Sequence, residues 1–261
     1  MFASNPFAEL SASISPAVMQ AYVVIMIILV AGGTLFDVWH KKSAKYFFNN
    51  WRNAKRKGTQ QVGSGEMTSL AIQTAAVDVA TSAEFCNPHR RIAHLLTMYG
   101  FLAYVITTAV MVFCYPTPTT STPSILTILW VLGALMVCAG GYWFWFLIRV
   151  DVAAEGHPPY RIVRADLFIL SLLASVTLGL IWAFLQAVDS SLATVFLGLY
   201  LFATTVLFGS IPWSKFSHMF FKPAAAFQKR VANANGSRSN LPPPADKPAT
   251  LGNPRRQPSH Y

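Results

Sequence analysis

Two of the six histidines lie where their side chains could bind one ligand together. His94 lies three residues after Arg91, about 4.5 Å inside a long apolar segment if that segment is helical. His218 lies six residues after Pro212, just beyond another apolar segment. If the first segment enters a membrane from the side on which the second leaves it, both imidazoles lie at similar depth. Two such histidines can supply both axial ligands of a b-type haem. The alternative is a pair of interfacial histidines with no cofactor.

The neighbours of these histidines fit a haem as well. Arg90, Arg91 and Lys215 are cations that can pair with haem propionates. Gly100 follows His94 by six residues and can leave room for a flat macrocycle. The other histidines are expected to be solvated or interfacial: His40, His89, His157 and His260. The cysteines show neither a CxxC pair nor iron–sulfur spacing, so they are expected to be small hydrophobic or exposed residues: Cys86, Cys114 and Cys138.

Five apolar segments must position these side chains. The chain is 54% hydrophobic and only 11% charged, whereas about 25% of residues in soluble domains are charged. Crossing a bilayer takes about 20 apolar residues, and each segment meets this length: Pro16–Phe36, Ile92–Cys114, Ser124–Ile148, Leu167–Val188 and Ser190–Ile211. The sequence therefore predicts an all-α, integral membrane five-helix bundle.

The basic residues set the expected orientation. With five crossings, all twenty Lys and Arg residues fall on one side, and short cytoplasmic loops carry the excess of Lys and Arg. We therefore expect the N-terminus outside and the C-terminus in the cytoplasm. The predicted parts are an external N-terminus (1–15), a membrane domain (16–222) with a cytoplasmic basic loop (41–91), and a flexible tail (223–261).

The basic side of the membrane is a candidate docking surface. Residues 41–57 alternate cations with aromatic rings, which suits an interfacial helix, and Gly58 is expected to end it. The net charge of +10 attracts an acidic soluble partner or anionic lipid, and these two readings stay open. Nucleic acid is not expected as a partner. The candidate docking residues are Lys41, Lys42, Lys55, Arg56 and Lys57.

Two short motifs resemble a known family. The run IPWSKFSHMF at residues 211–220 is similar to the end of the last span in the membrane subunit of respiratory nitrate reductase, a haem b protein. The run RIAHLL at residues 91–96 is similar to the start of that family's second span. The resemblance covers about residues 16–225, and it implies that His94 and His218 ligate haem iron.

The family usually holds a second haem, whose ligands correspond to Tyr104 and Tyr200 in this chain. Two matched replacements imply that the outer haem is absent, which leaves one haem b. The tyrosines then either pack in the bundle or hydrogen-bond a quinone, which would be an exchangeable substrate.

Smaller members of the family anchor soluble flavin and iron–sulfur reductases, and this chain looks most like those associated with adenylylsulfate reductase in sulfur-oxidising bacteria. The resemblance implies an electron-transfer subunit in the bacterial inner membrane that links a cytoplasmic reductase to quinone. It would be a non-catalytic or quinone-reactive subunit of an oxidoreductase complex. A haem-free anchor or assembly factor is the alternative. A small transporter is disfavoured, because transporters place ionisable residues within the membrane.

Overall fold

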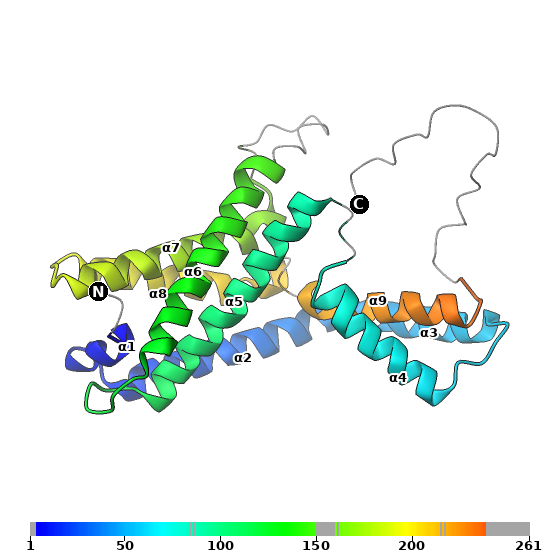
Figure 1. Cartoon of the computed structure of the whole chain (residues 1–261), viewed down its shortest axis with the longest axis horizontal. Helices are drawn as coiled ribbons and strands as arrows, with labels where there is room; N and C mark the ends of the chain where they lie inside the picture. Colours follow the sequence, from blue (N-terminus) through cyan, green and yellow to red (C-terminus); the bar gives the residue numbers. More distant parts are fainter. Residues whose placement is uncertain are drawn as a thin grey trace. The chain divides into compact units, whose positions relative to one another are not determined.

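The computed structural model describes residues 4–83, 85, 87–149, 160, 162–214, 216 and 218–238. These residues form helices joined by turns and contain no strand, as Figure 1 shows. The predicted all-α class is confirmed. The chain divides into two compact units. Unit 1 comprises Met1–Phe36 and Ile92–Phe216, and unit 2 comprises Asp37–Arg91 and Ser217–Tyr261.

Unit 1 is built from the apolar segments. Its α7 and α8 pack along each other (Figure 1). Asn87 caps the start of α5, because its Oδ1 accepts the backbone N–H of His89 at 2.9 Å. The helices are α1 (Pro6–Glu9), η1 (Leu10–Ala12), α2 (Pro16–His40, in unit 1 up to Phe36), α5 (Pro88–Cys114, in unit 1 from Ile92), α6 (Ser124–Trp143), the π-helical η3 (Phe144–Ile148), η5 (Arg164–Asp166), α7 (Leu167–Ala187), α8 (Ala193–Gly209) and η6 (Ile211–Trp213).

Among the described residues, four helices are long and apolar enough to cross a membrane: Pro16–His40, Pro88–Cys114, Ser124–Ile148 and Leu167–Ala187. They indicate a multi-pass membrane protein. The fifth predicted segment also forms an apolar helix, α8, but its 17 residues are fewer than in the other four. The helix α8 ends before Pro212, which lies in the 3-10 turn η6.

Glycines let neighbouring helices approach α6. A Cβ on Gly140 would lie 2.5 Å from the carbonyl oxygen of Ala93 in α5, and one on Gly141 would lie 2.7 Å from Leu173 in α7. Small residues allow such close contacts between membrane helices. Gly140 and Gly141 therefore let α5 and α7 approach α6 closely.

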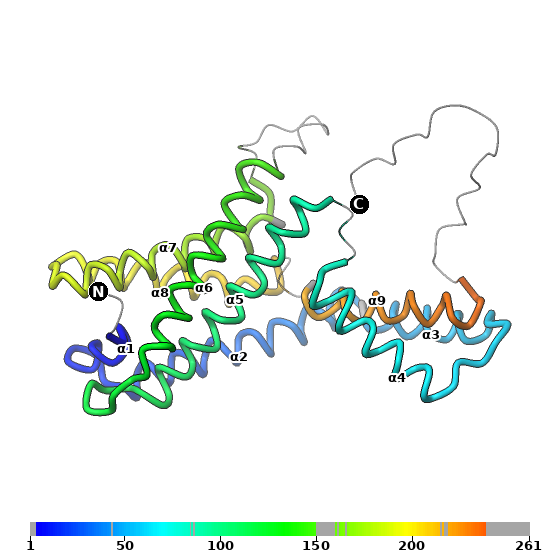
Figure 2. Tube along the Cα trace, in the orientation of Figure 1, coloured from blue at the N-terminus to red at the C-terminus, as the bar shows by residue number. Residues whose placement is uncertain are grey.

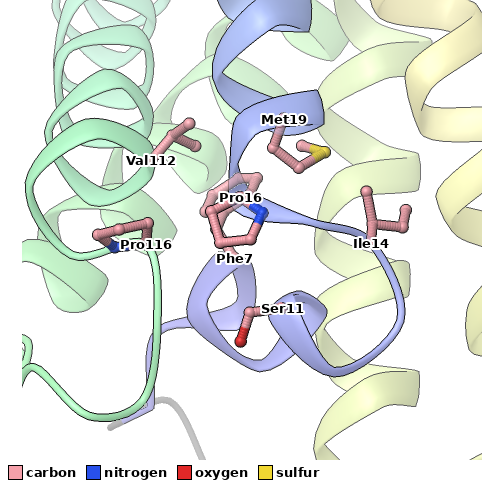
Figure 3. A pocket seen from close by; sticks show the side chains of 7 residues that line it. All are labelled: Phe7, Ser11, Ile14, Pro16, Met19, Val112 and Pro116. Carbon is pink, nitrogen blue, oxygen red and sulfur yellow. The ribbon is translucent and has the colours of Figure 1, made fainter.

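The N-terminal segment folds into unit 1, which the polar composition of residues 1–15 did not indicate. Asn5 accepts the N–H groups of Phe7 and Ala8 and so caps α1. Its amide also donates to the carbonyl oxygen of Tyr115 at 3.0 Å. The Phe7 side chain is only 4% exposed. Beside this segment lies a small, open hollow (Figure 3), lined by Phe7, Ser11, Ile14, Pro16, Met19, Val112 and Pro116.

Unit 2 contains α3 (Ser43–Lys57), α4 (Ser64–Gln73), the π-helical η2 (Thr74–Val79) and α9 (His218–Ala234). The helices α3 and α9 run side by side (Figure 2). Arg230 of α9 donates to Asp78 of η2 from Nε at 2.5 Å and from Nη2 at 2.9 Å. This hydrogen-bonded carboxylate raises the pKa of the Arg230 guanidinium. The pair ties α9 to η2.

The helix α9 differs from the flexible tail expected from residue 223. It continues through Pro223 to Ala234, because its apolar face has a partner within unit 2. Phe227 stacks on Trp51 of α3, and Val231 is buried. The rest of the expected tail, residues 239–261, lies outside the described residues.

Candidate functional site

The two predicted haem ligands belong to different units. His94 is half-buried on α5 in unit 1. His218 is the first residue of α9 in unit 2, and its side chain lies outside the described part of the chain, as does Lys215. The haem ligation therefore stays a prediction. As a donor set, two imidazoles from separate helices fit haem iron.

The face of α5 that carries His94 also carries an aromatic cluster of unit 1. Phe101 lies seven residues after His94, so the two share one helix face. Phe216, the last residue of unit 1, packs against Phe101 with ring centroids 6.4 Å apart. Phe216 also contacts Phe168 and Phe208 and is only 2% exposed. These contacts hold the end of unit 1 in place.

Gly100 lets α5 approach α6 closely. A Cβ on Gly100 would lie 2.7 Å from the carbonyl oxygen of Gly133 and 2.9 Å from the backbone nitrogen of Val137. The backbone of α6 thus takes the space that the missing side chain leaves. Room for a haem macrocycle beside Gly100 stays a prediction.

The two arginines before the second apolar segment lie at the start of α5. Arg91 donates from Nε to the carbonyl oxygen of Thr81 at 2.7 Å, which holds the chain before α5 in place. Arg90 is half-buried, and its backbone N–H points to the capping oxygen of Asn87 at 3.5 Å. Pairing of either arginine with a propionate stays a prediction.

The structure brings Tyr104 and Tyr200 together. The hydroxyl of Tyr104 on α5 donates to the hydroxyl of Tyr200 on α8 at 3.1 Å. The two residues are 5% and 4% exposed. A buried hydroxyl needs a hydrogen-bond partner, and here the tyrosines provide one for each other. This geometry favours the packing reading of the pair over a quinone contact.

Three aromatic residues that the sequence analysis missed enclose the tyrosine pair. Tyr104 stacks on Trp130 at 5.1 Å, and Tyr200 stacks on Trp182 at 5.7 Å. Phe7 closes the ring of contacts, at 5.8 Å from Trp130 and 5.3 Å from Trp182. The signal available for Phe7 was Asn5-Pro6, a helix-start pattern directly before it.

The basic docking residues lie on the surface of unit 2. Lys41, Lys42, Lys55, Arg56 and Lys57 are all exposed, and Lys41 forms an ion pair with Asp37. The helix α3 ends at Gly58 as predicted. The expected interfacial helix is corrected in one respect. Two of the rings of α3 pack inside unit 2, where Phe47 and Trp51 stack in line with Phe227 of α9.

The fold and the surface define a helical, multi-pass membrane protein with a separate basic unit. Residues 2–239 match the family described as CitB, citrate utilization protein B. The chain belongs to this family. Comparison with curated proteins gave no match, and comparison with solved structures gave none.

Proposed function

We propose that this protein is a membrane anchor and electron-transfer subunit. A soluble flavin or iron–sulfur enzyme docks on the basic surface of unit 2, and electrons pass between this enzyme and membrane quinone. The observation that carries the proposal is the separation of an exposed basic unit from membrane helices that hold almost no charge. Such a surface attracts an acidic soluble protein, while the apolar helices keep the complex at the bilayer.

The composition of the membrane helices argues against a transporter for citrate, the compound in the family's name. Binding a carboxylate inside the bilayer calls for cationic partners, and ionisable residues mark transport pathways. No Lys, Arg, Asp or Glu occurs between Ile92 and Ile148, and Asp189 alone occurs between Leu167 and Ser214. Citrate is therefore assigned to the soluble partner's metabolism and not to a site in the bundle.

The proposed cofactor is one haem b, ligated by His94 and His218. Haem supplies a one-electron carrier, and the protein holds and tunes it. His94 shares one face of α5 with Phe101, which packs against Phe216 at the end of unit 1. Arg90, Arg91 and Lys215 are the proposed propionate partners. The tyrosine pair stands at the positions where the nitrate reductase family usually has the ligands of a second haem.

The soluble partner is proposed from two sources. The resemblance points to an enzyme such as adenylylsulfate reductase, whereas the family name points to citrate utilization. The family match covers residues 2–239, and the resemblance covers only about residues 16–225 through short motifs. We therefore favour a redox enzyme that acts in citrate utilization.

A reduced-minus-oxidised absorption spectrum of the purified full-length protein tests the cofactor. We expect one low-spin b-type haem per chain, measured against protein concentration. Two haems per chain would contradict the assignment of Tyr104 and Tyr200 as packing residues. A purified protein with no haem would favour the alternative function, a haem-free membrane anchor or assembly factor.

We further propose five crossings, with the N-terminus outside and the C-terminus in the cytoplasm. The 17 residues of α8 extend about 25 Å, close to the roughly 30 Å of hydrocarbon in a bilayer. A reporter enzyme that is active only outside the cytoplasm, fused after Tyr261, should be inactive. The same reporter fused before Met1 should be active. Activity at the C-terminal fusion would refute this orientation and place unit 2 outside.

A further inference from the structure

One face of α3 carries a line of cations. A helix advances 100° per residue, so residues four, seven and eleven positions apart lie on one face. Lys45, Asn49, Arg52 and Arg56 follow this spacing, and all four are exposed. We call these four residues the α3 stripe. Lys55 and Lys57 are also exposed but lie on the two flanks of the helix.

The face of α3 opposite the stripe is already used inside unit 2. Ala54 is 4% exposed, and its carbonyl oxygen accepts the side-chain amide of Asn235 at 3.1 Å. The carbonyl oxygen of Phe47 accepts from Gln228 at 3.2 Å. Together with the stacking of Trp51 on Phe227, these contacts fix the orientation of α3. The stripe is thus held outward on a preformed surface, which lowers the entropy cost of binding.

No acidic residue lies near the stripe in the sequence. No Asp or Glu occurs from residue 38 to residue 65. Within the part of the chain that the structure describes, the ion pairs of unit 2 involve Lys41 and Arg230, and none involves a stripe residue. Three cations therefore face solvent with their charge uncompensated over about 16 Å of helix.

An amphipathic helix binds a membrane surface by burying its apolar face in the lipid. In α3 the rings of Phe47 and Trp51 stack in line with Phe227 of α9, so they are not free to enter lipid. Of the rings of α3, only Tyr46 and Phe48 remain exposed, on the flanks of the helix. Charge complementarity then favours an acidic protein surface, because carboxylates form directional hydrogen bonds with the Arg guanidinium groups.

We propose that the α3 stripe is the docking site for an acidic surface of the soluble redox partner. The carboxylates of that surface pair with Lys45, Arg52 and Arg56, and the amide of Asn49 lies between the cations. This inference rests on the proposed function and specifies which of the basic residues make the contact. Of the neighbouring cations Lys55, Arg56 and Lys57, only Arg56 belongs to the stripe, because consecutive side chains point in different directions around a helix.

The test uses a photo-crosslinking residue at position 49 of the full-length protein, expressed in its own host. The readout is the yield of crosslink to a soluble protein that contains flavin or an iron–sulfur cluster. The stripe variant is Lys45→Gln, Arg52→Gln and Arg56→Gln. The matched control is Lys55→Gln, Lys57→Gln and Lys229→Gln, which removes the same charge from exposed positions of unit 2 outside the stripe.

We expect the stripe variant to lower the crosslink yield about tenfold and the control to change it less than about twofold. High salt should lower the native yield, because exposed charges are screened beyond about 8 Å at physiological ionic strength. A charge exchange tests the pairing directly. Changing the stripe cations to Glu should remove the crosslink. Changing the carboxylates of the crosslinked partner segment to Lys should then restore it.

Three results would overturn the inference. An equal loss in both variants would mean that net charge attracts the partner without a defined site. An unchanged yield in both would exclude the stripe. A crosslink to phosphatidylglycerol in nanodiscs, with none to protein in cells, would assign the stripe to anionic lipid. The haem content of each preparation distinguishes failure of this inference from failure of the proposed function. If the native protein contains haem but gives no crosslink, the docking site is refuted and the proposed cofactor is not.

Discussion

Replacing His94 by alanine is expected to abolish the bis-histidine haem spectrum, and so is replacing His218. A methyl group cannot ligate iron, so each variant loses one of the two axial bonds of the proposed haem. The measurement is the reduced-minus-oxidised spectrum of the purified variant, normalised to protein. The loss should be complete and not graded, because a low-spin b-type haem of this kind requires both imidazoles.

His89→Ala is the matched control for the haem experiment. His89 lies on α5 only five residues before His94, but it is exposed and outside the apolar part of the helix. Its removal should leave the spectrum unchanged. A spectrum that survives both His94→Ala and His218→Ala would show that other residues ligate the haem. Monodisperse elution of each variant in detergent shows that the loss of the spectrum is not a loss of folding.

Gly100→Ala is expected to destabilise the folded protein even without cofactor. The added Cβ would lie 2.7 Å from the carbonyl oxygen of Gly133 and 2.9 Å from the backbone nitrogen of Val137. Backbone atoms cannot move aside as a flexible side chain can, so α5 and α6 must separate. Such overpacking costs about 1–3 kcal/mol. The measurement is the midpoint of thermal unfolding in detergent for haem-free protein.

Gly198→Ala provides the comparison for Gly100→Ala. Gly198 lies in α8 and would place its Cβ in open space, with nothing within 4 Å. It should leave the unfolding midpoint unchanged or raise it slightly, since alanine favours helix by about 1 kcal/mol over glycine. If Gly100→Ala lowers haem content but leaves the midpoint of haem-free protein unchanged, Gly100 serves the cofactor and not the helix contact.

The family resemblance relates Tyr104 to Tyr200, because it implies that both replace the ligands of one haem. It placed both at positions of one lost ligand pair, and the structure brings their hydroxyls to 3.1 Å. The sequence left open whether the tyrosines pack or bind quinone, because either role needs a buried polar ring. Their neighbours favour packing, since Trp130 and Trp182 come from two further helices. No local sequence pattern predicts stacking between rings on different helices.

The stretch from Pro223 was expected to be a flexible tail, and it begins as part of helix α9. Its aromatic residues are few, but Phe227 stacks on Trp51 and holds the helix within unit 2. Composition does not predict this contact, because burial of one aromatic ring depends on the pocket that distant residues form. The contacts of Phe7 with two tryptophans are of the same kind.

By itself the sequence determined the all-helical class, the apolar segments and the end of α3 at Gly58. These follow from short-range chemistry, because hydropathy, capping and helix-breaking residues act within a few positions. Only the tertiary structure decided that Gly100 faces α6, that the tyrosines bond each other, and that Lys45, Arg52 and Arg56 face outward. Each of these depends on which face of a helix meets a neighbour, and residues distant in the chain supply that neighbour.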